Sequence, residues 1–321
     1  RKAGDTLTLT QTYLERQLGL DSGSLDGIKD LNTAQDGSGK SVKLGSEWTV
    51  PDTDTTLYIQ YGSDPVPDPT PTKATVKKVI SDNWTTYAVK TDGTLWAWGD
   101  NSFGQLGVGD TEDRHSPVKV MDNVSTITAF NIENDGYYIW DSAFVVKTDG
   151  TLWAWGRNNH GQLGVGDTED RYIPVKVADN VSTITTDNVE NNGYNNTSDS
   201  AFIVRTDGTL WAWGINNYGQ LGVGDTQSRY TPVKVADNVS TITTNGGAAY
   251  AVKTDGTLWA WGDNSYGRLG VGDTQSRYNR YTPVKVADNV STITVSWDSA
   301  YAVKTDGTLW AWGYNYWGQL G

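Results

Sequence analysis

The 321-residue sequence contains no cysteine, one methionine and two histidines. The lack of cysteine excludes disulfide bonds, thiol catalysis and zinc sites with cysteine ligands. No apolar run approaches the roughly 20 residues that a membrane-spanning helix requires. Acidic residues outnumber basic ones, with a net charge of −13. This argues against nucleic acid as a partner, because phosphate binding needs clustered Lys and Arg. The composition fits a surface or secreted protein.

The sequence does contain a nine-residue block, TDGTLWAWG, in five identical copies. The copies are Thr91–Gly99, Thr148–Gly156, Thr206–Gly214, Thr254–Gly262 and Thr305–Gly313. Asp-Gly between two apolar runs predicts the turn of a β-hairpin. Trp96 and Trp98 are two positions apart, so they share one face of the following strand, with Leu95 and Ala97 on the other. We expect both tryptophans of each copy to be largely buried between or within the sheets.

Each block belongs to a longer unit with four short strands. The block is followed by Asn-x-x-Gly-Gln-Leu-Gly, in which Arg268 replaces Gln in the fourth copy. Then come a polar loop, Pro-Val-Lys-Val, an Asp-Asn turn, and Val-Ser-Thr-Ile-Thr at the start of the next unit. Four strands per unit predict the blades of an all-β propeller; a solenoid is the alternative, although its repeats are usually shorter. The expected blades are 75–122, 123–179, 180–237, 238–288 and 289–321.

TDGTLWAWG followed by NxxGQLG resembles the RCC1 repeat (regulator of chromosome condensation), in the form common in bacterial proteins. The resemblance covers roughly residues 75–321 and implies a seven-bladed propeller. Family repeats often carry a His before the second strand. This sequence has other residues there, so the role of that His does not carry over. That position holds Thr85, Ser142, Ser200, Ala248 and Ser299. Nuclear members are nucleotide-exchange factors that bind chromatin, and others are secreted inhibitors or interaction modules. The fold alone therefore does not indicate which function this chain has.

The first 62 residues lie outside the repeats. They resemble the small β-grasp-like repeats of bacterial surface proteins, of the internalin-B type, which serve as spacers. Residues 63–74 hold Pro65, Pro67, Pro69 and Pro71 at every second position, as in a semi-rigid linker. A spacer, a linker and a propeller together suggest a device that presents the propeller.

Alternating strand directions place the TDG and Asp-Asn turns at one face of the propeller, the turn face. The other loops lie at the opposite face, the loop face, where the repeats differ and where two insertions fall, at 130–140 and 187–199. Variable Tyr, Trp and Asn side chains are typical of adaptable binding surfaces. The candidate binding residues are Trp84, Phe103, Asn131, Tyr137, Tyr138, Trp140, His160, Tyr194, Asn195, Asn196, Tyr218, Tyr266, Trp297, Tyr314, Tyr316 and Trp317.

For two groups of these candidates, packing can be weighed against binding. The first group follows Asn-x in each repeat and always carries a ring, for which packing between blades is favoured over binding. Its members are Phe103, His160, Tyr218, Tyr266 and Trp317. The second group lies in the insertions, where binding is favoured over packing. Its aromatic members are Tyr137, Tyr138, Trp140 and Tyr194.

Catalytic and metal-binding patterns are weak. His115 and His160 are interpreted as solvated loop residues without a nucleophile motif. The Gly-Val-Gly-Asp-Thr runs have neither the helix nor the Lys of a phosphate loop. Acidic residues at the same place in four repeats were weighed as Ca²⁺ ligands, but they lack an EF-hand spacing. These are Asp110, Asp167, Asp225 and Asp273. Asn-x-Ser/Thr at Asn123, Asn180, Asn238 and Asn289 is interpreted as turn chemistry. We therefore expect no enzyme activity, metal or cofactor.

The sequence predicts a non-enzymatic binding module or adhesin, extracellular or at a cell surface, that engages a protein or glycan through the loop face. The alternatives are a structural spacer, a component of a surface assembly, or a secreted protein inhibitor. Because the family implies seven blades, five units are expected to form an open arc with apolar ends. Such a chain would be a fragment, or would be completed by another copy or a partner.

Overall fold

The computed structural model describes residues 6–8, 28–32, 41–43, 47–49, 58–61, 75–81, 84–134, 137–187, 199–272, 279–296 and 298–321. Up to residue 61, and at 130–134 and 137–141, only the backbone is described. The chain divides into two compact units, Arg1–Lys73 and Ala74–Gly321. Among the described residues, no helix has both the length and the apolar character needed to cross a membrane.

The first unit contains short antiparallel strands. β1 (Thr6–Thr8) pairs with β4 (Glu47–Thr49), and β2 (Ile28–Asn32) lies between β3 (Ser41–Lys43) and β5 (Tyr58–Tyr61). In β1 and β3, polar and apolar residues alternate along the strand. The β-grasp resemblance stays a prediction, and the linker at 63–74 lies outside the described residues.

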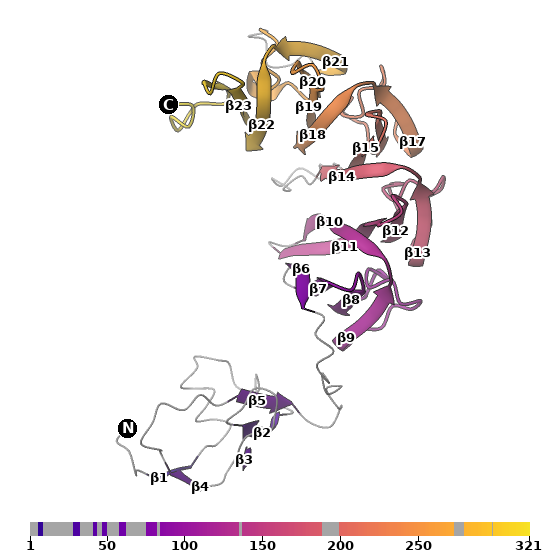
Figure 1. The fold of residues 1–321 in the computed structure, drawn as a ribbon, viewed down its shortest axis with the longest axis vertical. Helices are drawn as coiled ribbons and strands as arrows, with labels where there is room; N and C mark the ends of the chain where they lie inside the picture. Colours follow the sequence, from indigo (N-terminus) through magenta and orange to yellow (C-terminus); the bar gives the residue numbers. More distant parts are fainter. Residues whose placement is uncertain are drawn as a thin grey trace. The chain divides into compact units, whose positions relative to one another are not determined.

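The second unit consists of consecutive antiparallel sheets, here called blades one to five (Figure 1). Blade one contains β6 (Val76–Ser81), β7 (Thr85–Lys90), β8 (Leu95–Gly99) and β9 (Arg114–Met121). Blade two contains β10 (Val124–Asn134), β11 (Tyr137–Lys147), β12 (Leu152–Gly156) and β13 (Arg171–Ala178). Blade three contains β14 (Val181–Asp187), β15 (Ser200–Arg205), β16 (Leu210–Gly214) and β17 (Arg229–Ala236). Blade four contains β18 (Val239–Asn245), β19 (Ala248–Lys253), β20 (Leu258–Gly262) and β21 (Arg280–Ala287), and blade five contains β22 (Val290–Ser296), β23 (Ser299–Lys304) and β24 (Leu309–Gly313).

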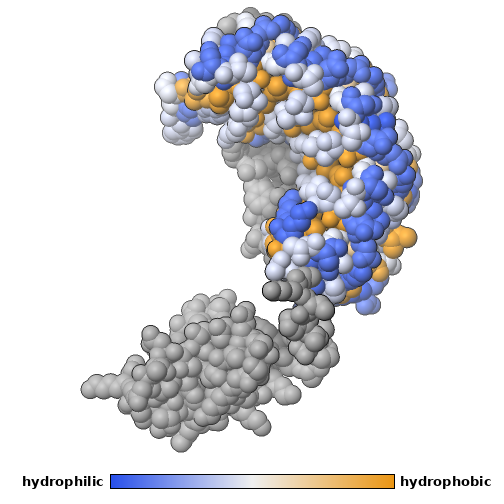
Figure 2. All heavy atoms as spheres, in the orientation of Figure 1, coloured by the Kyte–Doolittle hydropathy of each residue, from blue (hydrophilic) through white to orange (hydrophobic). Residues whose placement is uncertain are grey.

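The blades of this unit stand along an arc, with blades one and five at its opposite ends (Figure 1). The first strands of blades two to five contact one another, and the fourth strands lie on the outer side. Figure 2 shows that this outer side is mostly hydrophilic. The described blades therefore do not close into a ring, and completion to seven blades stays a prediction.

Local hydrogen bonds explain why each TDGT segment turns. The Asp92 carboxylate accepts from the Thr94 backbone N–H at 2.9 Å and from its hydroxyl at 2.7 Å. Gly93 and Asn123 both adopt positive φ, +80° and +62°. Such a φ is easy for Gly and tolerated by Asn. The Gly93 carbonyl accepts from Val124 N–H at 2.8 Å, so the TDG and Asp-Asn turns lie together on the turn face, as predicted. Positive φ at Asn123 also agrees with the interpretation of that position as turn chemistry.

At each boundary, the two neighbouring blades contribute different surfaces: small apolar residues of one blade pack against a tryptophan of the next. Leu95 and Ala97 of blade one and Trp155 of blade two are all fully buried in one apolar cluster. The Trp155 indole N–H donates to the backbone carbonyl of Gln105 at 2.7 Å. Gly107 passes so close that a Cβ there would lie 2.7 Å from the indole nitrogen. Trp213, Trp261 and Trp312 donate in the same way to the carbonyls of Gln162, Gln220 and Arg268.

The prediction that both tryptophans are largely buried is confirmed in blades two to four, where the second one is more deeply buried than the first, whereas Trp310 of blade five is 56% exposed. Trp155, Trp213 and Trp261 are fully buried, whereas Trp153 and Trp211 are half-buried. The first tryptophan lies at the turn end of its strand, at the partly exposed edge of the apolar cluster between the blades. There the Trp153 indole N–H donates to the Thr151 hydroxyl at 2.9 Å, and the Lys147 ammonium lies 4.8 Å from the ring centroid.

Candidate functional site

Buried amides shape the base of the loop face. In blade one, Asn101 and Gln105 have no exposed surface. The Asn101 side-chain carbonyl accepts from Leu106 N–H at 2.9 Å, and its amide donates to the Asp110 backbone carbonyl at 2.9 Å. The Gln105 side-chain carbonyl accepts from Phe103 N–H at 2.9 Å. Asn and Gln of the NxxGQLG motif are therefore structural, a role that sequence reasoning did not assign.

The ring position after Asn-x contacts the next blade in blades one to three. The Arg157 guanidinium lies 5.1 Å from the centroid of the Phe103 ring. His160 Nδ1 lies 2.5 Å from a carboxylate oxygen of Asp199, and the Tyr218 ring lies against Gly247. All three rings are half-buried, so packing between blades is confirmed for them.

Both histidine interpretations need correction. His160 is paired with Asp199 across the boundary between blades two and three, because its ring turns toward the next blade. His115 lies within strand β9 rather than in a loop, although its side chain is exposed.

Blade four departs from this arrangement. Arg268 stands where the other blades have Gln, and a guanidinium has no acceptor for the N–H of the ring residue. The loop instead forms a short 3₁₀ turn, η1 (Ser265–Gly267), in which Tyr266 adopts φ +58° and its side chain is 56% exposed. Positive φ is rare for a bulky residue and is typical of functional loops. Tyr266 still packs against the next blade, because its ring meets that of Tyr314 in blade five at 4.9 Å, but it is more exposed than its counterparts in blades one to three.

The Arg268 guanidinium makes ionic contacts on both sides of the boundary between blades four and five. It forms an ion pair with Asp263 of the same blade, and it lies 3.1 Å from a carboxylate oxygen of Asp298 in blade five. It also donates to the Asn245 carbonyl at 3.3 Å. Arg268 is buried, so these contacts fix the boundary between blades four and five.

Three tyrosines meet at the loop face of blades four and five, and we call them the tyrosine cluster: Tyr266, Tyr314 and Tyr316. The Tyr266 and Tyr314 ring centroids are 4.9 Å apart in an edge arrangement, and those of Tyr314 and Tyr316 are 6.2 Å apart and stacked. Trp317 contacts Tyr316 from the side, at 4.8 Å. Tyr266, Tyr316 and Trp317 are exposed. The structure thus brings together four of the predicted site residues.

A buried carboxylate lies at the boundary between blades three and four. One oxygen of Asp187 accepts from Gly247 N–H at 3.0 Å, and the other has no hydrogen-bond partner among the described residues. Burial raises the pKa of Asp187 to about 7, although the Gly247 hydrogen bond and the Arg268 charge act in the opposite direction. Sequence reasoning placed Asp187 at the edge of an insertion and missed this role.

The first insertion is a strand extension and not a loop. β10 and β11 continue as a hairpin in which Asn131 pairs with Trp140 and Glu133 with Tyr138, after a register shift next to Phe130. Tyr137 is the first residue of β11. The alternating sequence with Asp135-Gly136 carries the same hairpin signal as the repeated block, and this signal could have predicted the extension.

Some candidates cannot be placed together with the cluster. Tyr194, Asn195, Asn196 and Trp297 lie outside the described residues. Trp84 is half-exposed in the loop before β7, on blade one.

Three of the four repeated loop aspartates are engaged within their own loops, and the fourth, Asp273, lies outside the described residues. Asp110 pairs with Arg114 at 2.6 Å, and Asp167 and Asp225 make equivalent pairs. The hydrogen bond from Arg114 holds the pKa of Asp110 below its usual value. In the part of the chain that the structure describes, no group of three acidic or His residues is arranged to hold a metal ion.

Consecutive four-stranded sheets with interlocked boundaries define a tandem-repeat protein of the β-propeller class. A family model described as the regulator of chromosome condensation (RCC1) repeat matches residues 92–130, 149–187, 207–246 and 255–303, and a second RCC1-repeat model matches 239–268. These stretches make up slightly more than half of the chain. The chain belongs to the family of RCC1-repeat proteins.

Among curated proteins, the chain is 30% identical over 240 residues to the ultraviolet-B receptor UVR8 of Arabidopsis thaliana, covering 70% of this chain and 50% of the receptor. It is 31% identical over 158 residues to the E3 ubiquitin-protein ligase HERC2 of Homo sapiens, covering 47% of this chain and 3% of the ligase. The chain thus spans about half the length of the first relative and a small part of the second. These relatives are eukaryotic, and the bacterial form of the repeat stays a prediction.

Solved structures agree on the fold. Human WBSCR16 matches with a TM-score of 0.58 at 21% identity, covering 84% of this chain and 69% of that protein. Yeast RCC1 (Prp20), in its complex with Kap60, matches with a TM-score of 0.58 at 18% identity, covering 80% of this chain and 60% of that protein. At these identities the likeness concerns the RCC1-like propeller fold alone.

Proposed function

We propose that this protein is a non-enzymatic binding module whose loop face engages a protein or a glycan, with the tyrosine cluster at the centre of the contact. One observation carries the proposal. The equivalent rings of blades one to three are half-buried against the next blade, whereas Tyr266 stays 56% exposed while it contacts Tyr314 of blade five. An exposed ring that groups with other exposed aromatic side chains is typical of a surface built for contact.

The chemistry of the cluster suits recognition. Tyrosine gives a large, stiff contact area at a low cost in conformational entropy, and its hydroxyl can donate or accept. Ring faces and edges are both presented, because Tyr314 stacks on one neighbour and meets the other edge-on. Arg268 is shielded below by two carboxylates, so it offers little attraction to anions. The favoured ligand is therefore an uncharged glycan or an aromatic-binding protein surface.

A location outside the cell or at its surface, and a role in adhesion, are part of this proposal. They are supported by the acidic, cysteine-free composition. A structural spacer is the main alternative function, and it predicts that no side chain of the loop face is needed for a ligand.

The test compares Tyr266→Ala and Tyr314→Ala with Ile173→Ala on a glycan array and in pull-downs from candidate partner cells. Ile173 is exposed to a similar degree as Tyr266, but it lies on the outer strand β13. Each tyrosine substitution should reduce binding at least tenfold, while the control retains it. Binding that the tyrosine variants retain in full would contradict the proposed site. The absence of any ligand in both assays would favour the spacer.

A further inference from the structure

One buried cation, Arg268, is shared by the carboxylates of three blades. Its guanidinium is paired with Asp263 of its own blade and lies 3.1 Å from a carboxylate oxygen of Asp298 in blade five. Its charge also acts on Asp187 of blade three, where it favours the ionised form of the carboxyl. Because one guanidinium serves three acidic side chains, these side chains compete for it.

Two buried atoms of this group have no hydrogen-bond partner among the described residues, Asp187 Oδ1 and Arg268 Nε. Both side chains contact the tip of the hairpin between β18 and β19. The second oxygen of Asp187 accepts from Gly247 N–H at 3.0 Å, and a Cβ on the adjacent Gly246 would lie 2.8 Å from an Arg268 nitrogen. An ionised Asp187 and Arg268 would therefore gain a charge-assisted hydrogen bond by a short movement toward each other.

The proton on Asp187 decides whether this carboxylate competes for Arg268. Burial raises the pKa of Asp187 to about 7, against the effects of the Gly247 hydrogen bond and the Arg268 charge. Below this pH the carboxyl is neutral and leaves Arg268 to its other two partners. Above this pH a buried negative oxygen without a partner is costly, so its attraction for the guanidinium increases.

Other ionisable groups surround Asp187. The Asp199 carboxylate raises the pKa of Asp187 by its charge, and it is itself paired with His160 of blade two at 2.5 Å. Two tyrosines near the same charges, Tyr218 and Tyr250, have pKa values raised by burial and therefore stay neutral. Since histidine titrates near neutral pH, the His160–Asp199 pair needs its own control in a pH experiment.

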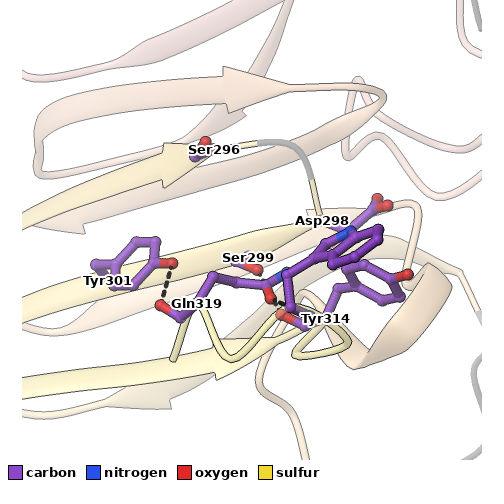
Figure 3. Close-up of a pocket in the computed structure, with 7 residues that line it drawn as sticks. Ser296, Asp298, Ser299, Tyr301, Tyr314 and Gln319 are labelled. Atoms are coloured by element: carbon purple, nitrogen blue, oxygen red, sulfur yellow. Dashed lines mark hydrogen bonds between the residues drawn. The ribbon is translucent and has the colours of Figure 1, made fainter. Parts of the chain in front are cut away.

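The ion pair between Arg268 and Asp298 is connected to the tyrosine cluster on both sides. Asp298 and Tyr314 lie next to each other on blade five, where the Tyr314 backbone N–H donates to the Asp298 carbonyl at 2.9 Å (Figure 3). Arg268 follows Tyr266 by two residues in the same loop. The ring centroids of Tyr266 and Tyr314 are 4.9 Å apart. The ion pair thus holds together the two segments that carry this ring contact.

We propose that pH regulates the tyrosine cluster through a competition between Asp187 and Asp298 for Arg268. When Asp187 loses its proton, it draws Arg268 toward blade three, and the ion pair with Asp298 weakens. The ring contact between Tyr266 and Tyr314 then opens, and the binding surface is assembled only below neutral pH. This regulation rests on the proposed function, because it concerns the same surface. The element with two states is a guanidinium with two alternative sets of partners.

The experiment is a nuclear magnetic resonance titration of the full chain without ligand, from about pH 5 to about pH 9. Tyrosine rings and aspartate carboxyl carbons carry ¹³C, and Tyr266→Phe and Asp187→Asn assign the two signals. In the wild type, the Tyr266 ring and the Asp187 carboxyl should change with one shared midpoint near pH 7. A Tyr266 signal that stays constant, or that follows a different midpoint, would overturn the regulation. Because no ligand is present, that result would leave the proposed binding function standing.

Two variants should fix the cluster in opposite states. Asp187→Asn should keep the Tyr266 signal at its low-pH position throughout the titration. Asp298→Ala removes the competing partner, so it should keep the signal at its high-pH position, and it also tests the proposal if Asp187→Asn does not fold.

Two controls should retain the wild-type transition. Asp237→Asn removes an exposed carboxylate of the turn face, and His160→Gln removes the neighbouring histidine. A transition that persists in Asp187→Asn, or one that disappears in His160→Gln, would show that another group controls the cluster and would overturn the proposal.

Discussion

The turn face and the loop face are built from the same repeats by opposite means. At the turn face, the Asp carboxylate accepts from the Thr N–H at 2.9 Å and from the Thr hydroxyl at 2.7 Å in all five repeats. At the loop face, the contacts run to the next blade and differ at each boundary, as the Phe103, His160 and Tyr218 rings show. The turn face is held by hydrogen bonds within each turn, so its residues are the same in every repeat. The loop face is held by contacts to the next blade, so its residues can vary from one boundary to another.

The largest expected effect compares the two tryptophans of blade three. Trp213→Ala removes a fully buried ring below the loop face and its bond to Gln162, so it should lower the free energy of unfolding by about 3–5 kcal/mol. Trp211→Ala removes a half-buried ring at the turn face and should cost about 1–2 kcal/mol. Urea denaturation measures both. Equal costs would mean that the two ends of the strand are buried alike.

Asp187 provides a pH-dependent comparison. Its pKa in the folded protein, about 7, exceeds the value near 4 expected in the unfolded chain. The folded state therefore binds the proton more tightly, and the free energy of unfolding should fall as pH rises from about 4 to about 7. Asp187→Asn should remove this slope and stabilise the protein at pH 8 by on the order of 1–3 kcal/mol.

The measurement is urea denaturation at pH 5 and pH 8. Asp237→Asn, at an exposed position on the turn face, serves as the control and should leave the slope unchanged. A slope that persists in the Asp187 variant would show that another group causes it.

Arg268→Gln should convert blade four to the arrangement of the other blades. The new side-chain carbonyl can accept from Tyr266 N–H, and its amide can donate to Asp263, as Gln105 does to Asp100 at 2.5 Å. We expect Tyr266 to adopt negative φ and to become half-buried, with a change in stability within about 1 kcal/mol. A crystal structure of the variant tests this. The reciprocal Gln220→Arg should expose Tyr218, and an unchanged Tyr266 would contradict the proposed cause.

The smallest effect is expected for one turn of the turn face. Asp207→Ala removes two hydrogen bonds to Thr209 at the exposed surface and should lower the thermal midpoint only slightly. The hydroxyl of Thr209 holds the pKa of Asp207 below its usual value. Because the folded pKa is depressed, this contribution is present above pH 4 and is lost as pH falls below it. Scanning calorimetry at pH 3 and pH 7 should show a difference between variant and wild type only at pH 7.

Much of the fold could be predicted from the sequence, because its signals are local. The Asp-Gly turns, the period-two strands and the assignment of turns to one face require only the residues that form them. The difference in burial between Trp211 and Trp213 could not be predicted, because the two side chains share a face of the strand. Only the structure shows that the ring nearer the turn is less enclosed by the preceding blade.

The site was predicted less well. Arg268 was visible as a departure from the motif, but its consequence for Tyr266 depends on a hydrogen bond from the ring residue to Gln that no spacing reveals. The strand extension at Asn131–Trp140 was missed because a long insertion suggested a loop, although its own alternation and Asp-Gly pair predicted a hairpin.

The hydrogen bond from an indole N–H to a backbone carbonyl of the preceding blade also affects how such an array can grow. Each boundary takes its donor from one repeat and its acceptor from the repeat before it, as in Trp155 and Gln105. Recombination between two identical TDGTLWAWG segments would therefore add or remove a complete repeat and recreate the same boundary on both sides. The number of repeats can therefore change while the packing at each boundary is preserved. Each repeat carries its own loop-face residues, so such a change also places these residues next to different ones.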